Sequence, residues 1–209
     1  FNQLDKEFCE GFKDYLLNTK SRKSAKTKLK VNSAVSYFNK FKAALKQAYQ
    51  DEYLRFDLNA SLTGIKPEET HRDYLTIEEL NSLASTPCNN PILKRAAMFS
   101  ALTGLRFSDI EKMFWKEIRF EKGQGYSIVY RQRKTKGAEV LPISDQAAEI
   151  LGEIGNLDDK VFDGLKYSAY SNKHLFQWIG AAGITKDITF HCFRHTYAIL
   201  QLANGTDIY

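Results

Sequence analysis

The sequence predicts a mainly α fold, with an all-helical N-terminal domain over residues 1–65, a linker over 66–74 and a mostly helical second domain over 75–209. Apolar residues recur at three- and four-residue spacing in both parts, as they do on the buried face of a helix. Three short β-prone runs near the middle, separated by turns that contain glycine, predict one small three-stranded antiparallel sheet. With 43% hydrophobic residues among 209, the chain can form real cores, which excludes a disordered tail.

The N-terminal part predicts two long helices and a short one. The first helix is indicated by apolar residues spaced four apart, namely Leu4, Phe8, Phe12 and Leu16. A second helix is expected from about Ala25 to Tyr49, with its basic residues near its start and with Val35, Phe38, Phe41, Leu45 and Ala48 on its apolar face. Leu58 and Leu62 suggest a further short helix, and Gly64 with Pro67 then breaks the pattern.

The second part opens with recognisable helix signals. Thr76 and Glu79 have the spacing of a capping box, in which each side chain accepts a hydrogen bond from the other residue's backbone. Pro91 suits the first turn of the next helix, and Gly104 suits its end. Ser108 and Glu111 repeat the capping-box spacing, so residues 105–107 are expected in a tight connection between two helices.

The predicted sheet and the final helices follow. The runs EIRF, YSIVYRQ and EVLPI have β-prone composition, and EKGQG and KTKGA lie between them. Helical spacing then returns after Ala147, again around Leu175, and finally through HCFRHTYAILQLA, which ends at Asn204 and Gly205.

Positive charge is concentrated in the first third of the chain. Residues 1–66 carry 13 Lys and Arg against 7 Asp and Glu, whereas the remainder carries 17 against 18. One segment without acidic residues holds six of these cations: Lys20, Arg22, Lys23, Lys26, Lys28 and Lys30. Because cations that neutralise phosphates release condensed counterions, such a surface suits a polyanion. A solvated basic loop is an equally good interpretation of this feature alone.

Several classes of protein are disfavoured by composition. Cys9, Cys88 and Cys192 are too few and too scattered for a disulfide framework or a four-thiolate zinc site, which favours a reducing compartment. No apolar run approaches the roughly 18 to 20 residues of a membrane span, and the N-terminal stretch is amphipathic and acidic. Secretion and membrane insertion are therefore not expected.

The last predicted helix carries the most specific polar cluster. His191, Arg194 and His195 stand at i, i+3 and i+4, so their side chains share one face of a helix that is otherwise apolar. A zinc site would use the two histidines, but Cys192 stands where the H-E-x-x-H pattern has glutamate, and Arg194 would place a cation beside the metal. A satisfied structural cluster is the other alternative.

Two further cations are candidates for chemistry. Arg106 lies in a short connection after an apolar helix, where it could present its guanidinium to an anion while Asp109 holds it in place, although a structural Arg–Asp pair would look the same. Lys134 lies in the turn between two predicted strands, where a solvated charge is usual and where Arg131, Arg133 and Lys136 compete for any role.

The motifs G-L-R-F-S-D, R-K-T-K-G and H-C-F-R-H-T, in that order, resemble those of the tyrosine recombinases, the phage-integrase family of site-specific DNA recombinases. The resemblance covers the whole chain. The N-terminal third is similar to the family's helical core-binding domain, and residues from about Tyr74 onward are similar to its catalytic domain. Integrases of mobile elements are the type that the chain resembles in general texture.

The resemblance implies a role for each matched position. Arg106 and Arg194 correspond to the two catalytic arginines, His191 to the histidine of H-x-x-R and Lys134 to the lysine of the β-hairpin, with Asp109 and His195 supporting them. The two guanidinium groups would pair with the non-bridging oxygens of the scissile phosphate and stabilise its transition state without a metal or cofactor. Lys134 would protonate the departing 5′ oxygen, and His191 would assist proton transfer at the attacking phenol.

The expected nucleophile is a tyrosine that forms a 3′-phosphotyrosine. Tyr209 follows Arg194 too closely and lies directly behind the predicted helix end, and Tyr197 lies one turn from Arg194 in the same helix. The chain is therefore expected to be truncated before its nucleophile and to bind DNA without cleaving it.

The resemblance further implies double-stranded DNA as partner, a tetramer on DNA, possible accessory DNA-bending proteins, no membrane contact and a cytoplasmic, nucleoid-associated location in a bacterium. Two other classes of function stay open: a non-catalytic DNA-binding module with the same fold, and a metal-dependent hydrolase that uses His191 and His195. The related type IB topoisomerases share the chemistry, but the compact two-domain layout fits recombinases better.

Overall fold

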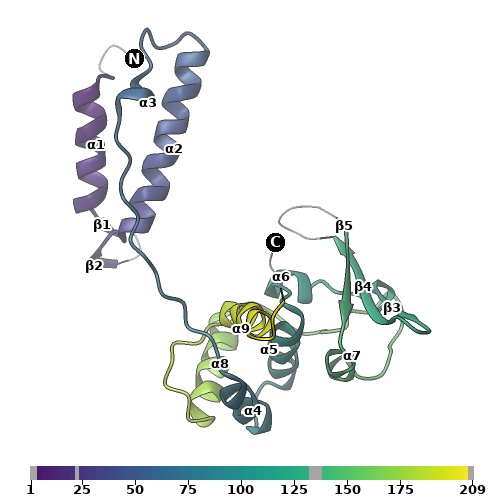
Figure 1. The fold of residues 1–209 in the computed structure, drawn as a ribbon. Helices are drawn as coiled ribbons and strands as arrows, with labels where there is room; N and C mark the ends of the chain where they lie inside the picture. The colour runs from purple at the N-terminus through teal and green to yellow at the C-terminus, as the bar shows by residue number, and fades with distance from the viewer. Residues whose placement is uncertain (1–3, 22–23, 132–137, 207–209) are drawn as a thin grey trace. The chain divides into compact units, whose positions relative to one another are not determined.

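The computed structural model describes residues 4–21, 24–131 and 138–206. The chain separates into two compact units, Phe1–His71 and Arg72–Tyr209, each of which is described by itself (Figure 1). Helices dominate both units, and a three-stranded antiparallel sheet lies in the second, so the predicted fold class is confirmed. Among the described residues, no helix is both long and apolar enough to cross a bilayer.

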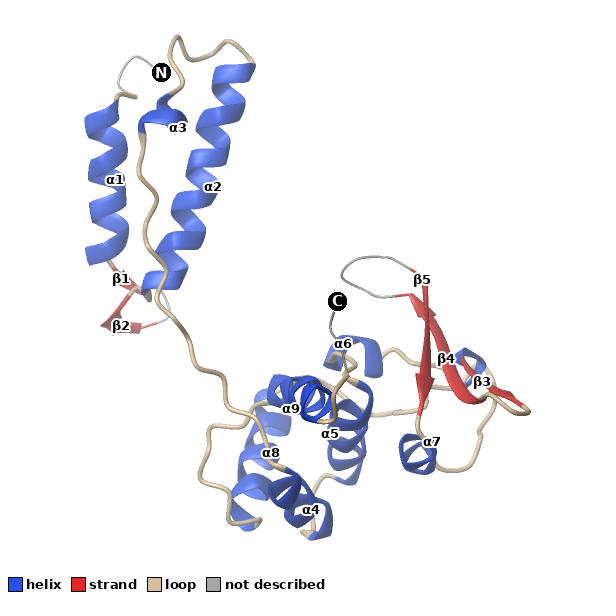
Figure 2. Cartoon of the chain, viewed as in Figure 1, coloured by secondary structure: helices blue, strands red, loops and turns tan. Residues whose placement is uncertain are grey.

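The N-terminal unit is built on two long helices, drawn blue in Figure 2. Helix α1 (Lys6–Asn18) begins at Asp5, whose carboxylate accepts a hydrogen bond from the backbone of Phe8, and α2 spans Val31–Gln50. The short α3 (Leu58–Ser61) follows. The core between these helices includes the fully buried Phe38, and the rings of Phe12 and Phe41 meet at 4.8 Å between centroids.

The basic segment forms a β-hairpin, whereas the sequence pattern predicted the start of a helix. Strands β1 (Lys20–Ser21) and β2 (Ser24–Lys28) pair antiparallel, and α2 starts at Val31 and not near Ala25. Between Lys20 and Lys28, Ala25 is the one apolar residue, so a helix here would have no apolar face to bury against the core. The N-terminal unit is therefore mostly helical, and the prediction that it is all-helical is wrong at this hairpin.

The second unit opens with three helices whose boundaries match local chemistry. Helix α4 (Ile77–Ser85) has the predicted capping box between Thr76 and Glu79. Helix α5 (Pro91–Thr103) starts with its proline and ends at Gly104, which adopts the left-handed conformation at φ 68°. Helix α6 (Phe107–Ile110) starts one residue before Ser108, with Arg106 as its N-cap, so the second predicted capping box is wrong.

The sheet has the predicted three strands in the order β3 (Ile118–Glu121), β4 (Gly125–Arg131) and β5 (Ala138–Ile143), both pairs antiparallel. The 3₁₀ turn η1 (Trp115–Glu117) leads into it, and α7 (Asp145–Leu151) follows it. Ile128 at the centre of β4 is fully buried and ties the sheet to the helical core.

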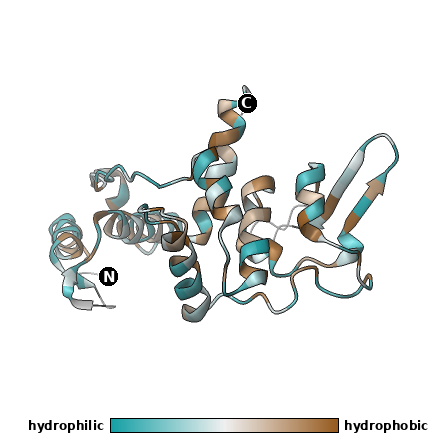
Figure 3. Ribbon diagram, turned by 90° about the horizontal axis from the view of Figure 1, so that it is seen from below, coloured by the Kyte–Doolittle hydropathy of each residue, from teal (hydrophilic) through white to brown (hydrophobic). Residues whose placement is uncertain are grey.

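Helices α8 (Ala169–Ala181) and α9 (Phe190–Ala203) complete the second unit. Helix α9 packs against α5, and its Phe193 is fully buried and stacks on Trp178 of α8. The hydropathy colouring in Figure 3 shows hydrophilic and hydrophobic residues alternating along the helices, as expected when one face of a helix is buried. Because the apolar face of α9 is packed in the core, the positions of its polar residues are set by that packing.

Candidate phosphate-binding site

A pocket of about 350 Å³ in the second unit brings together residues that lie far apart in the sequence. Arg106, His191 and Arg194 all line it. Its other walls are largely apolar and aromatic, and they include Phe107, Tyr167 and Phe176, with the carboxylate of Asp187 also present. Two guanidinium groups beside one small pocket form a site for an anion with two accessible oxygens.

Arg106 is placed by the end of α5. Gly104 stops that helix, and Arg106 then adopts an extended backbone before α6 begins. The carboxylate of Asp109, which is 3% exposed, lies 4.0 Å from the guanidinium of Arg106 and 3.6 Å from the ammonium of Lys112. The predicted pairing of Arg106 with Asp109 is therefore present, with Lys112 as an additional partner that the sequence analysis missed.

Arg194, which also lines the pocket, is held by a hydrogen bond to the backbone. Its guanidinium donates a hydrogen bond to the carbonyl oxygen of Gly104. This bond connects α9 to the end of α5, two residues before Arg106. Burial lowers the pKa of Arg194, and the nearby charge of Arg106 lowers it further. Two cations that disfavour each other across a pocket are stabilised by a bound anion, which is what this geometry favours.

The two histidines of α9 meet an arginine that the sequence analysis assigned to the linker. The Nη1 atom of Arg72 lies 2.9 Å from Nε2 of His195 and 3.4 Å from Nε2 of His191. The imidazole rings stand nearly perpendicular at 4.7 Å between centroids. No local pattern marks Arg72, because its partners lie 119 and 123 residues further along the chain.

The same contact bears on the zinc interpretation. A guanidinium has only donors, so each Nε2 that faces Arg72 uses its lone pair for that hydrogen bond. Both histidines have a lowered pKa; burial is the first cause for each, and the surrounding cations add to it. A site crowded with arginines disfavours a divalent metal, and the described part of the chain shows no group of three or more metal-ligand side chains.

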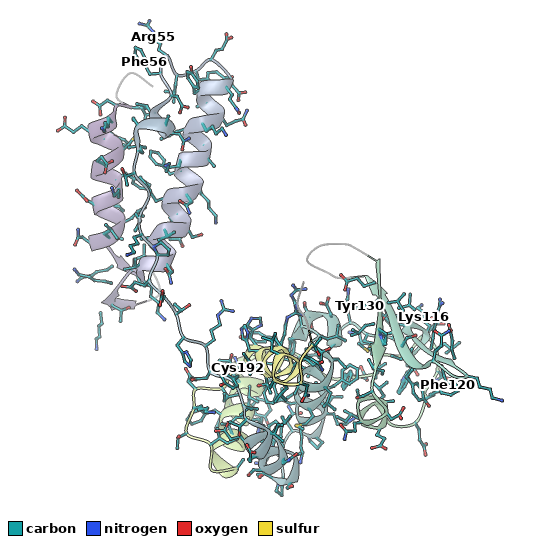
Figure 4. The ribbon with its side chains drawn as sticks, viewed as in Figure 1. Arg55, Phe56, Lys116, Phe120, Tyr130 and Cys192 are labelled. Atoms are coloured by element: carbon teal, nitrogen blue, oxygen red, sulfur yellow. The ribbon has the colours of Figure 1, made fainter. Side chains whose placement is uncertain are left out.

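Lys134 lies outside the described residues, so its place in the site stays a prediction. The strands that flank its turn are described: Tyr130 on β4 donates a hydrogen bond to Glu139 on β5 at 3.0 Å. Figure 4 labels Tyr130 on β4 and Cys192 on α9. Burial and the charge of Arg106 lower the pKa of Arg194, and carboxylates that include Glu139 act in the opposite direction.

The basic segment of the N-terminal unit forms a separate cationic surface. In the hairpin, Lys20 lies directly opposite Lys28, and both are exposed, as are Lys26 and Lys30. A groove of about 890 Å³ beside them is lined by Lys20, Lys28 and Lys30 together with Tyr15 and Tyr37. Like charges placed opposite each other destabilise a hairpin unless an anion neutralises them. Arg22 and Lys23 lie outside the described residues.

Two family models together match nearly the whole chain. The model described as "Phage integrase family" matches residues 73–209, and the "Phage integrase SAM-like domain" matches residues 1–62. The chain belongs to the phage integrase family. The resemblance to tyrosine recombinases drawn from the sequence is therefore confirmed, and site-specific DNA recombination is the activity of this integrase family.

Solved integrase structures share the fold at low identity. A lambda integrase dimer bound to a COC′ core site matches with a TM-score of 0.61 and 18% identity, over 97% of this chain and 75% of that one. The Tn1549 transposon integrase in complex with circular intermediate DNA matches with a TM-score of 0.64 and 16% identity, over 96% and 74%. A lambda integrase tetramer bound to a Holliday junction matches with a TM-score of 0.63 and 18% identity, over 99% and 62%.

This integrase family member thus spans between about six tenths and three quarters of the length of those solved chains. A search of the curated proteins finds no match to its sequence.

Proposed function

We propose that this integrase recognises double-stranded DNA with its N-terminal unit and activates one phosphodiester in the pocket of its second unit for site-specific strand cleavage and rejoining. The observation that carries the proposal is the convergence of Arg106, His191 and Arg194 on one pocket from two distant parts of the sequence. Family membership supplies the reaction class. The alternative of a binding module without catalysis is an outcome of the experiments below.

The proposed chemistry uses charge and proton transfer alone. Arg106 and Arg194 would each pair with a non-bridging oxygen and stabilise the negative charge that grows as the phosphorus becomes pentacovalent. A tyrosine phenol would lose its proton and bond to phosphorus, and the bond to the 5′ oxygen would break as Lys134 protonates that oxygen. The 3′-phosphotyrosine ester conserves the energy of the cleaved phosphodiester bond. Attack by a 5′ hydroxyl on this ester, the reverse of cleavage, would rejoin a strand.

His191 lines the pocket beside the two arginines and would contact the phenol or phosphate oxygen. Asp109 would support the site by holding Arg106 from behind, and His195 by its shared contact with Arg72. The low pKa of both histidines keeps them neutral near pH 7, so His191 would transfer or share a proton without adding a fixed charge.

We also propose that residues 1–209 by themselves bind DNA but do not cleave it. Tyr197 lies three residues from Arg194 on the same helix, with its ring beside Gly104, and so has no freedom to attack a phosphate that Arg194 holds. Tyr167 lines the pocket, but it precedes the H-x-x-R-H motif, whereas the family's nucleophile follows it. Tyr209 lies outside the described residues.

This prediction is tested in two steps. Selection from a pool of random duplexes identifies a preferred site, and that site is then used as a nicked suicide substrate for residues 1–209 and for the intact gene product. We expect both proteins to bind, and only the intact product to form a covalent protein–DNA adduct. An adduct on residues 1–209, mapped to Tyr167, Tyr197 or Tyr209 by mass spectrometry, would contradict the prediction. Binding without any adduct in the intact product would favour a non-catalytic module.

The hairpin cations are expected to set the salt dependence of binding. The double variant Lys26→Gln and Lys28→Gln should weaken affinity for every DNA sequence to a similar extent, because cations that pair with phosphates read no sequence information. The slope of log K against log salt concentration should fall by about 0.9 for each phosphate that the variant no longer neutralises. Fluorescence anisotropy over a series of salt concentrations measures both quantities.

A matched double variant in the second unit, Lys122→Gln and Lys160→Gln, removes the same charge and is the control for the hairpin variant. We expect it to change the affinity and the slope less than the hairpin variant does. An equal effect of the two double variants, or an unchanged slope in the hairpin variant, would contradict the prediction. The hairpin lysines would then be solvated charges that do not contact DNA phosphates.

Assembly and location follow from the same proposal. The solved neighbours include an integrase dimer on a core site and an integrase tetramer on a Holliday junction, which supports a tetramer that forms on DNA for this protein. Work on chromosomal or mobile DNA would place it at a bacterial nucleoid, with accessory DNA-bending proteins as possible further partners.

A further inference from the structure

The contact of Arg72 with both histidines fixes where their protons lie. Arg72 donates through Nη1, at 2.9 Å to Nε2 of His195 and at 3.4 Å to Nε2 of His191. A guanidinium cannot accept a hydrogen bond, so each Nε2 must be unprotonated, and the proton of each neutral ring must be on Nδ1. The contact with Arg72 therefore selects the Nδ1–H tautomer for both rings.

The backbone after Arg72 is fastened to the helix that carries the histidines. The carboxylate of Asp73 accepts a hydrogen bond from the backbone of Asp187, three residues before α9. The backbone N–H of Leu75 donates to the hydroxyl of Thr196 at 2.9 Å, and both of these residues are fully buried. Because these bonds anchor residues on α9 and just before it, Arg72 is held in place relative to His191 and His195.

The charged groups around the two rings act in one direction. Burial is the first cause of the lowered pKa of His191, followed by His195, Arg72, Arg194 and Arg106. Burial is also the first cause for His195, followed by Arg72 and Arg194. Asp187 is the carboxylate among the described lining of the pocket. Burial, together with these cations, favours the neutral form of both rings, which is the state in which the tautomer matters.

We infer that Arg72 is a positioning residue for the proposed cleavage step, because it holds His191 and His195 in the Nδ1–H form and so makes Nδ1–H the hydrogen-bond donor that His191 can offer to an oxygen in the pocket. His191 lines the pocket and Arg72 does not. Because Nε2 of His191 faces Arg72, Nδ1 is the ring nitrogen that is left for a partner in the pocket. This inference rests on the proposed function. Arg72 lies outside the three sequence motifs that resemble those of the family.

The tautomers are measured by long-range ¹H–¹⁵N spectra of histidine-labelled residues 1–209. The chain has four histidines, and single His→Gln substitutions assign the signals of His191 and His195. We expect the Nδ1–H form and titration midpoints below the ordinary value for both. In Arg72→Gln the Nε2–H form should become populated and the midpoints should rise, whereas Arg72→Lys, which keeps a donor-only cation, should retain the Nδ1–H form. Arg119→Gln, an exposed arginine on β3, is the matched control and should change neither.

A cleavage assay on the intact gene product separates this inference from the proposed function. Arg72→Gln should cleave about tenfold more slowly, a part of the roughly 10²-fold or greater contribution of a positioned proton-transfer group, and Arg72→Lys should restore most of the rate. Nε2–H rings in the unsubstituted chain, or unchanged spectra in Arg72→Gln, would overturn the inference, as would full cleavage by Arg72→Gln while the proposed function stands. Failure of the unsubstituted product to cleave its selected site would overturn the proposed function and the role of Arg72 with it.

Discussion

Strand cleavage by the intact gene product is expected to fall by about 10²- to 10³-fold in Arg194→Ala and by a similar factor in Arg106→Ala, while the affinity for DNA stays within a few-fold of the unsubstituted protein. Removing one preorganised donor from a developing oxyanion has an effect of that order. Both side chains line the same pocket, and each is held by the protein before any phosphate arrives, Arg194 by the Gly104 carbonyl and Arg106 beside Asp109. Rates on a nicked suicide substrate and anisotropy on the same duplex measure the two quantities.

Controls distinguish a catalytic loss from a folding loss. Arg119→Ala removes an exposed arginine from β3 and should cleave at the normal rate. Arg194→Lys keeps the charge but not the paired donors, so it should recover only part of the activity. If Arg106→Ala and Arg194→Ala unfold, or lose all binding in parallel with cleavage, the two arginines are structural and the proposed site is wrong.

Gly104→Ala is expected to lower the free energy of unfolding of the second unit by about 2 to 5 kcal/mol. Alanine in the left-handed conformation costs about 1 to 2 kcal/mol, and Gly104 has a φ of 68°. A Cβ there would also lie 2.5 Å from the Tyr197 ring, so that ring would have to move, and overpacking of a well-packed core costs about 1 to 3 kcal/mol. Urea unfolding followed by circular dichroism measures the decrease.

Gly164→Ala is the matched control for the backbone part of this effect. Gly164 also has a positive φ, of 81°, but an added Cβ there would meet nothing within 4 Å. It should therefore show only the conformational contribution. In Gly104→Ala combined with Tyr197→Ala, the clash is relieved, so the double variant should be destabilised by less than the sum of the single variants. Equal destabilisation in Gly104→Ala and Gly164→Ala would mean that the approach of Tyr197 carries no strain.

The elements that local chemistry specifies were predicted well. The capping box at Thr76, the proline start and glycine end of α5, and the three strands all depend on residues within a few positions of each other. The basic hairpin and the start of α6 were missed. Between Lys20 and Lys28, Ala25 is the one apolar residue, so a helix there would have no apolar face to bury. Arg106 keeps an extended backbone after Gly104, so α6 begins at Phe107.

In the candidate site too, some residues could be predicted from the sequence and others could not. Arg106, His191 and Arg194 could be nominated from motifs, because residue type and spacing within each motif carry the signal. Arg72 could not, because nothing near it in the chain indicates what it contacts. Lys112 was missed although it lies three residues after Asp109, a spacing at which side chains on a helix meet. Lys134 remains a prediction from its motif alone.

The order and types of its residues alone determine that this chain is mainly helical, that its positive charge gathers near one end, and that it carries the motifs of an integrase. Hydrophobic periodicity, helix caps and charge distribution depend on residues that are close together in the chain, so they can be recognised in the sequence alone. Only the tertiary structure decided that Arg106 and Arg194 share a pocket and that Arg72 serves both histidines. Those contacts depend on how α9 packs against α5 and on where the chain after residue 71 meets α9, and such long-range packing leaves no local pattern.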